Sequence, residues 1–149
     1  MDWIEIKTED DIKNLLNTFG WFHDGCLREI HLWNSYHVSE DLGMGCGDYS
    51  INAKVLFQRQ FENPSAIEVY FREIQRMNIV STSSDYWYSI FGVTLEYKDG
   101  IYYWADEEDW NIDNPNNDNT MWISAKGIKW RDRSEFIGEK LRYGKRVGR

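Results

Sequence analysis

The residue types best suited to chemistry gather in one short run, Trp21-Phe22-His23-Asp24-Gly25-Cys26. His23 and Asp24 could form a general base with its orienting carboxylate or a pair of metal ligands, and Cys26 could supply a thiolate. Adjacent residues of an extended strand point to opposite faces, so His23 and Asp24 converge only if the chain turns there. No Cys-x-x-Cys, His-Glu-x-x-His or Gly-x-Ser-x-Gly pattern is present.

We therefore expect no catalytic residue, no metal site and no cofactor, and we assign Phe22, His23 and Asp24 a structural role. Asp24 suits the cap of a turn, because aspartate side chains hydrogen-bond to nearby backbone. His23 is expected to pack beside Trp21 and to hydrogen-bond to the backbone that leads into the first strand. His31 shares a strand face with His23, but an extended chain separates the two by roughly 26 Å. The sequence thus favours a protein that is not an enzyme.

A second chemical candidate is the acidic stretch 106–119, which contains Asp106-Glu107-Glu108-Asp109 followed by several Asn and Asp residues. Carboxylate and amide oxygens are the ligands that calcium prefers. The glycine and the terminal bidentate glutamate of an EF-hand loop are absent, and Pro115 interrupts the stretch. We interpret it as a solvated acidic loop or, as argued below, as a contact surface.

Periodicity predicts the elements that would position these residues. Thr8 suits an N-cap with Asp11 three residues later, and Ile12, Leu15, Leu16 and Phe19 recur at helical spacing. Gly20 ends this helix. From Cys26 onward the period becomes two, which predicts strands over 26–33, 49–61 and 66–74.

Two glycine turns complete the expected sheet. Asp99-Gly100 predicts a hairpin between 91–97 and 101–105, because both turn residues tolerate positive φ. Lys126-Gly127 predicts a second hairpin between 121–125 and 128–131, and 134–142 has the apolar spacing of a short C-terminal helix. The expected fold class is α+β, with one N-terminal helix and a mainly antiparallel sheet of six or seven strands joined by hairpins. A length of 149 residues predicts a single domain over 1–149, with 144–149 as a frayed tail.

Charge is divided unevenly along the chain. Residues 1–125 carry 22 acidic and 8 basic side chains, whereas residues 126–149 carry 3 acidic and 9 basic ones. The acidic body repels phosphates, so we do not expect it to bind nucleic acid. The basic C-terminal residues either contact RNA or an anionic surface, or neutralise the acidic body within the fold, and the second account is simpler. No apolar run approaches the roughly 18 residues of a membrane-spanning helix. The N-terminus lacks the features of a signal peptide, and Cys26 and Cys46 fit reduced thiols, so we expect a cytoplasmic protein.

Two segments resemble a known group of proteins. The run from Phe22 to Ile30, Phe-His-Asp-Gly-Cys-Leu-Arg-Glu-Ile, and the later strand from Ile67 to Ile74, Ile-Glu-Val-Tyr-Phe-Arg-Glu-Ile, are similar to small bacterial proteins with an N-terminal Phe-His-Asp-Ser type motif. Some members are assigned as immunity proteins of polymorphic toxin systems. The resemblance covers residues 10–75, and Gly25 replaces the usual small hydroxyl residue. It implies a protein that binds a cognate toxin, and it carries over no catalytic residue.

Composition agrees with a protein-binding role, since acidic clusters among eight Trp and nine Tyr are suited to an interface with aromatic anchors and a charged rim. A basic nuclease is one toxin that such a surface would attract. The alternative is a β-rich module that binds a glycan or small molecule, with Trp33, Trp87, Trp104, Trp110, Trp122 and Trp130 as stacking platforms. The candidate partner-binding residues are Asp106, Glu107, Glu108, Asp109, Trp110 and Asp113, with Trp87 from the aromatic run Tyr86-Trp87-Tyr88.

Overall fold

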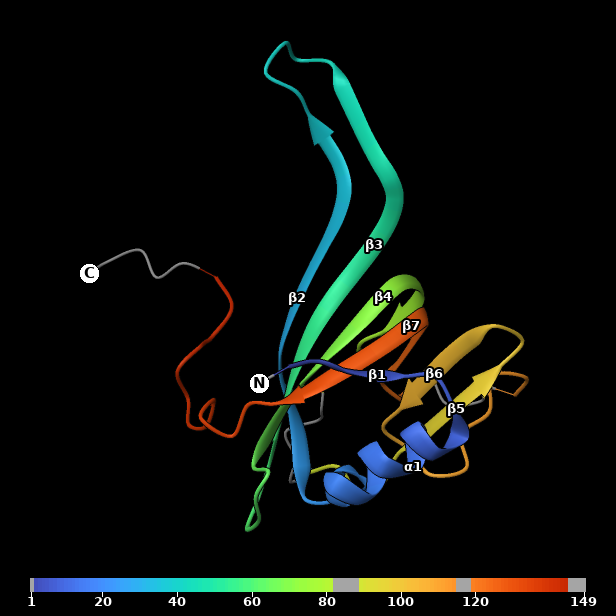
Figure 1. Cartoon of the computed structure of the whole chain (residues 1–149), viewed down its shortest axis with the longest axis vertical. Coiled ribbons are helices and arrows are strands. Elements are labelled where there is room, and N and C mark those ends of the chain that lie inside the picture. The colour runs from blue at the N-terminus through green and yellow to red at the C-terminus, as the bar shows by residue number, and fades with distance from the viewer. Residues whose placement is uncertain (1, 82–88, 115–118, 145–149) are drawn as a thin grey trace.

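A single seven-stranded sheet organises the chain, and the computed structural model describes residues 2–81, 89–114 and 119–144 (Figure 1). The strands are β1 (Ile4–Ile6), β2 (Gly25–Val38), β3 (Met44–Arg59), β4 (Ala66–Asn78), β5 (Thr94–Lys98), β6 (Ile101–Ala105) and β7 (Trp122–Asp132). Their order is β2-β3-β4-β7-β6-β5, with β1 also paired to β7. All the strand pairings described are antiparallel. The sheet-rich α+β class expected from the sequence is confirmed.

Helix α1 (Glu9–Thr18) covers one face of this sheet. It begins after Thr8, whose hydroxyl accepts the Asp11 N–H at 3.2 Å while the Asp11 carboxylate accepts the Thr8 N–H at 3.0 Å. This reciprocal pair satisfies two N–H groups that a helix start leaves without partners. The buried helix residues Ile12, Leu15 and Leu16 join the core formed by the strands. No helix in the described ranges has the length and apolar character needed to cross a membrane.

Strand alternation divides the side chains between two faces of the sheet. The core face, which packs against α1, carries Val55 and Phe57 of β3 and Trp130 of β7. The opposite face, called here the far face, carries Glu68 of β4 and Arg131 of β7, which are paired across the ladder. The far face thus carries buried charged groups together with aromatic residues such as Tyr70, whereas the core face is mainly apolar.

A short left-handed segment connects α1 to β2. Gly20, Trp21 and Phe22 have φ values of 57°, 58° and 61°, and these three residues form the 3₁₀ turn η1 (Gly20–Phe22). The reversal places the Phe22 ring in the core beside Phe57, with ring centroids 5.0 Å apart. It leaves the Trp21 side chain at the surface, where its indole N–H donates to the side-chain amide oxygen of Asn17 at 3.3 Å.

The β5–β6 hairpin ends the sheet on one side. Its two-residue turn consists of Asp99 and Gly100, with φ values of 52° and 84°. Positive φ at both positions is the geometry that matches the twist of paired strands. On the other side of the sheet, β2 and β3 extend together well beyond the remaining strands, and α1 lies at the opposite end of the molecule, near β5 and β6 (Figure 1).

The expected hairpin at Lys126-Gly127 is wrong, because β7 runs through both residues as one strand. Gly127 pairs with Arg72 of β4, and a Cβ at this position would lie 2.5 Å from the Arg72 guanidinium. The glycine therefore makes room for a side chain on the neighbouring strand, which the local sequence does not reveal.

The short C-terminal helix expected over 134–142 is also wrong. The Asp132 carboxylate accepts hydrogen bonds from the Ser134 N–H at 2.8 Å and from its hydroxyl at 2.6 Å, which closes a turn. The Gln58 amide then donates to the carbonyl oxygens of Phe136 and Gly138. The Gln58 side chain of β3 thus satisfies two carbonyl groups that a helix would otherwise bond within itself.

Candidate functional site

Three of the predicted interface carboxylates hold the loop after β6 in place. The Asp106 carboxylate accepts the Met121 N–H at 2.9 Å, and the Glu107 carboxylate accepts the Thr120 hydroxyl at 2.6 Å. Asp113 pairs with Lys98 next to the β5–β6 turn. Burial raises the pKa of Asp106 from 3.8 to about 6, and the neighbouring Glu107 charge adds to this effect. These three carboxylates therefore make intramolecular contacts that position the loop, in place of the partner contacts predicted for them.

Trp110 is also part of the structure. Its indole is 5% exposed and packs on Trp122 with ring centroids 5.2 Å apart and on Tyr103 at 6.0 Å. The backbone N–H of Trp110 donates to the Thr94 hydroxyl at 3.1 Å, and that hydroxyl donates to the backbone carbonyl oxygen of Glu107 at 2.8 Å. Trp110 thus connects the loop to β5 and is buried, whereas the sequence analysis predicted an exposed aromatic anchor. Trp87, the remaining candidate, lies outside the described residues.

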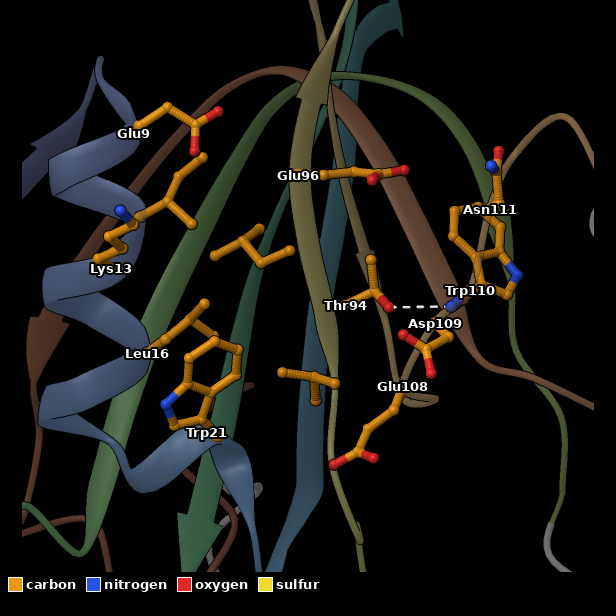
Figure 2. A pocket seen from close by; sticks show the side chains of 13 residues that line it. Glu9, Lys13, Leu16, Trp21, Thr94, Glu96, Glu108, Asp109, Trp110 and Asn111 are labelled. Atoms are coloured by element: carbon orange, nitrogen blue, oxygen red, sulfur yellow. Dashed lines mark hydrogen bonds between the residues drawn. The ribbon is translucent and has the colours of Figure 1, made fainter.

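The other two predicted carboxylates, Glu108 and Asp109, are exposed and border a groove of about 530 Å³ around β5 (Figure 2). Glu108 comes close to β5 because position 92 is glycine: a Cβ there would lie 2.3 Å from a Glu108 carboxylate oxygen. Asp109 has φ 58°, which turns the chain back toward Trp110. The loop therefore presents two carboxylates beside the last strand of the sheet.

The groove gathers further acidic side chains that the sequence keeps far apart. Glu9 comes from the first turn of α1 and Glu96 from β5, and one ammonium group, that of Lys13, faces them from α1. In the described part of the chain, none of these five charged groups, Glu108 and Asp109 included, takes part in an ion pair. Excess negative charge therefore borders the groove.

Apolar groups form the floor of the groove. Ile12 and Leu16 of α1 and Leu95 of β5 lie along it, and they belong to the main core. Trp21 lies at the helix end of the groove and is 49% exposed, so about half of its surface is open to a contact (Figure 2). An exposed indole beside carboxylates and an aliphatic floor is suited to a partner with basic and apolar side chains.

Sequence analysis missed Glu9, Trp21 and Glu96 as site residues. Glu9 has the pattern of a helix-dipole residue and Glu96 that of an ordinary strand residue. Glu9 and Glu96 lie near each other because β5, at the end of the sheet, borders the same groove as α1. Trp21 gave one signal, since it follows Gly20 at the end of the helix, where the chain must turn.

The chain turns at Asp24, so the His23 and Asp24 side chains approach each other, with His23 Nε2 3.6 Å from Asp24 Oδ2. His23 Nδ1 lies 2.7 Å from the Phe91 carbonyl oxygen, and its ring packs edge-on against the Phe91 ring. Asp24 has φ 60°, and its N–H donates to the Ile90 carbonyl oxygen at 2.9 Å. The pair therefore holds the segment before β5 against the start of β2, and His23 contacts Phe91, not Trp21 as expected. Cys26 and Cys46 are both free thiols, and no described cluster of three or more His, Cys, Asp or Glu could hold a metal ion.

Basic residues of β7 neutralise acidic residues of the far face. Glu68, 2% exposed, accepts hydrogen bonds from the Arg131 guanidinium at 2.8 Å and from the Tyr143 hydroxyl at 2.6 Å. The Glu29 carboxylate accepts the backbone N–H groups of Arg142 and Tyr143. Burial, with the charge and hydrogen bond of Glu68, raises the pKa of Tyr143 well above its ordinary value. Arg131 and Arg133 thus form intramolecular ion pairs, and the expected frayed tail, 144–149, lies outside the described residues from 145 onward.

Comparison with known proteins gives no assignment for this arrangement: the chain matches no protein-family model, no curated protein and no solved structure.

Proposed function

We propose that this protein binds another protein and acts as an immunity-type inhibitor, neutralising a bacterial toxin by covering its functional site. The acidic groove around β5 is the observation that carries the proposal. Glu9, Glu96, Glu108 and Asp109 surround an apolar floor, and Trp21 is available as an aromatic anchor. The resemblance of the two sequence segments to proteins that include immunity proteins supports the same interpretation.

Electrostatics favours a basic partner, and a nuclease domain is the toxin type that fits best. A site that binds phosphates carries Lys and Arg side chains, and an acidic surface accelerates encounter with such a site and matches its potential. Salt screens this attraction over about 8 Å at physiological ionic strength. The association rate should therefore fall as the salt concentration rises, while the dissociation rate changes less.

The glycan-binding alternative has less support from the structure. It requires several tryptophan faces in one concave patch, but Trp104, Trp110 and Trp130 are 1%, 5% and 3% exposed. These indoles are packed in the interior and cannot stack on a sugar ring. Trp21 is the aromatic side chain that the groove itself offers to a ligand.

The test uses the full chain as bait in cells that co-express the product of the neighbouring open reading frame, in a strain where that product is toxic. We expect a stoichiometric complex and restored growth. A double variant, Glu108→Gln with Asp109→Asn, should slow association at low salt by about tenfold, because two groove charges are removed.

A matched control removes the same number of charges elsewhere. Asp2→Asn with Glu40→Gln changes two exposed carboxylates outside the groove and should leave the association rate within about twofold of wild type, since rim charges far from a contact contribute little. Growth inhibition that persists with a well-expressed, folded protein would contradict the immunity function. Equal effects of both double variants would mean that the groove is not the contact surface.

A further inference from the structure

The groove is built around the edge of a strand and not around one face of the sheet. Four consecutive residues, from Val93 to Glu96, line it. Neighbouring side chains on a strand point to opposite faces, so a surface that lies on one face contacts only every second residue. Contact with all four requires that the backbone edge of β5 itself borders the groove.

That edge has free hydrogen-bonding groups. Among the described residues, β5 pairs with β6 alone and ends the order of the sheet. The two-residue turn makes Lys98 and Ile101 a hydrogen-bonded pair, and alternation then directs the backbone groups of Glu96 and Thr94 toward β6. The N–H and C=O groups of Leu95 and Tyr97 consequently point to the open side of β5.

The two sides of this edge differ in chemistry. Leu95 faces α1, where Ile12 and Leu16 supply aliphatic side chains. Thr94 and Glu96 point away from α1, on the side where Glu108 and Asp109 lie (Figure 2). A strand added next to β5 would place alternate side chains against the aliphatic wall and against the carboxylates.

We propose that the free edge of β5 receives an extended segment of the partner protein whose residues alternate between apolar and basic. The segment adds an eighth strand to the sheet by pairing with Leu95 and Tyr97. Its main-chain hydrogen bonds supply affinity, and the two walls select its side-chain pattern. This mode of binding rests on the proposed protein-binding function and specifies its partner.

A synthetic peptide tests the pairing without a known partner. The probe is a capped heptapeptide of alternating Val and Lys, and the reference peptide has the same composition with the Val and Lys residues in separate blocks. Titration of the isotope-labelled full chain, followed by amide NMR, should show at least about tenfold tighter binding of the alternating peptide, with the largest shifts at the Leu95 and Tyr97 amides. Equal binding of the two peptides would overturn the proposal.

A matched pair of variants tests the backbone contact. Tyr97→Pro removes the outward N–H, whereas Tyr97→Ala removes the ring, which packs on Tyr102 at 4.8 Å, and keeps the N–H. Binding of the alternating peptide should fall at least about tenfold further in Tyr97→Pro than in Tyr97→Ala. Similar binding by both variants would refute strand addition.

Peptides with N-methylated backbone amides test the same hydrogen bonds on the wild-type protein. The outcome then does not depend on whether the proline variant folds. N-methyl groups on one alternate set of residues should abolish binding, and those on the other set should be tolerated, because only one edge of the added strand faces β5. Tolerance of both sets overturns the proposal.

The toxin complex separates this proposal from the proposed function. Toxin binding that depends on Glu108 and Asp109 but not on the Tyr97 N–H would retain the immunity function and overturn the strand pairing. Peptide binding that follows the predicted pattern in the absence of any toxin complex would support the pairing and count against the immunity function.

Discussion

Replacing Asp106 with asparagine should stabilise the protein at neutral pH. The Asp106 carboxylate is partly buried, accepts the Met121 N–H at 2.9 Å, and has a pKa raised by burial from 3.8 to about 6. At pH 7.5 the carboxylate is ionised in the folded protein, and partial burial makes that charge less favourable there than in the unfolded chain. Asparagine keeps an oxygen acceptor for Met121 and carries no charge, so Asp106→Asn removes the cost and retains the contact.

The size and pH dependence of the effect follow from linkage. A shift of about two units corresponds to about 3 kcal/mol, and because the carboxyl is partly exposed, solvent screening reduces the expected gain to about 1–2 kcal/mol. The folded state binds the proton more tightly than the unfolded state does. The stability that this proton provides is complete below pH 4, falls as the pH rises, and is lost once the pH has passed 6. Asp106→Asn should thus match wild type near pH 4 and exceed it above pH 7.

Urea unfolding followed by tryptophan fluorescence at several pH values between 4 and 8 measures this difference. Asp113→Asn serves as the control, because Asp113 is exposed and pairs with Lys98 at the surface, where such pairs contribute less than about 1 kcal/mol. A variant at Asp106 that is less stable than wild type at pH 7.5, or a difference that stays constant with pH, would refute the argument.

Three further substitutions test the fold. Glu68→Ala should lower the free energy of unfolding by about 3–5 kcal/mol in denaturant titrations, because it leaves the Arg131 guanidinium without its buried partner; a loss below 1 kcal/mol would contradict this. Gly25→Ala should cost about 1–3 kcal/mol in the same assay, since its Cβ would lie 2.9 Å from the Phe22 carbonyl oxygen, and an unchanged midpoint would show that the backbone yields easily. Thr8→Ala should cost about 1 kcal/mol through loss of the helix cap, and calorimetry should show the corresponding fall in Tm.

Local signals in the sequence predicted the parts of the fold whose cause is local. Thr8 and Asp11 form a cap within one turn of helix, and Asp99-Gly100 carries its own turn geometry. The same reasoning failed at Lys126-Gly127, because the reason for that glycine lies on another strand, in the Arg72 guanidinium. A glycine that gives a turn its positive φ and a glycine that clears space for a neighbour look identical in one sequence.

The sequence predicted some residues of the candidate site and not others, for a similar reason. Glu108 and Asp109 belong to a visible acidic run, and the sequence identified them. Trp110 belongs to the same run, but the Thr94 hydroxyl and the Trp122 ring draw it into the interior. Which member of an acidic and aromatic run is exposed depends on packing from distant strands, and composition does not contain that information.

The division of charge along the sequence becomes a division in space that favours the groove as the contact surface. Arg131 and the backbone of 142–143 satisfy Glu68 and Glu29 on the far face, so part of the acidic charge of the body is neutralised there. Among the described residues that line the groove, four carboxylates accompany one ammonium group, that of Lys13. If the proposed basic partner binds at the groove, the groove carboxylates attract it to a place where the sheet also offers an unpaired strand edge, and the two features together orient an incoming strand before its first hydrogen bond forms.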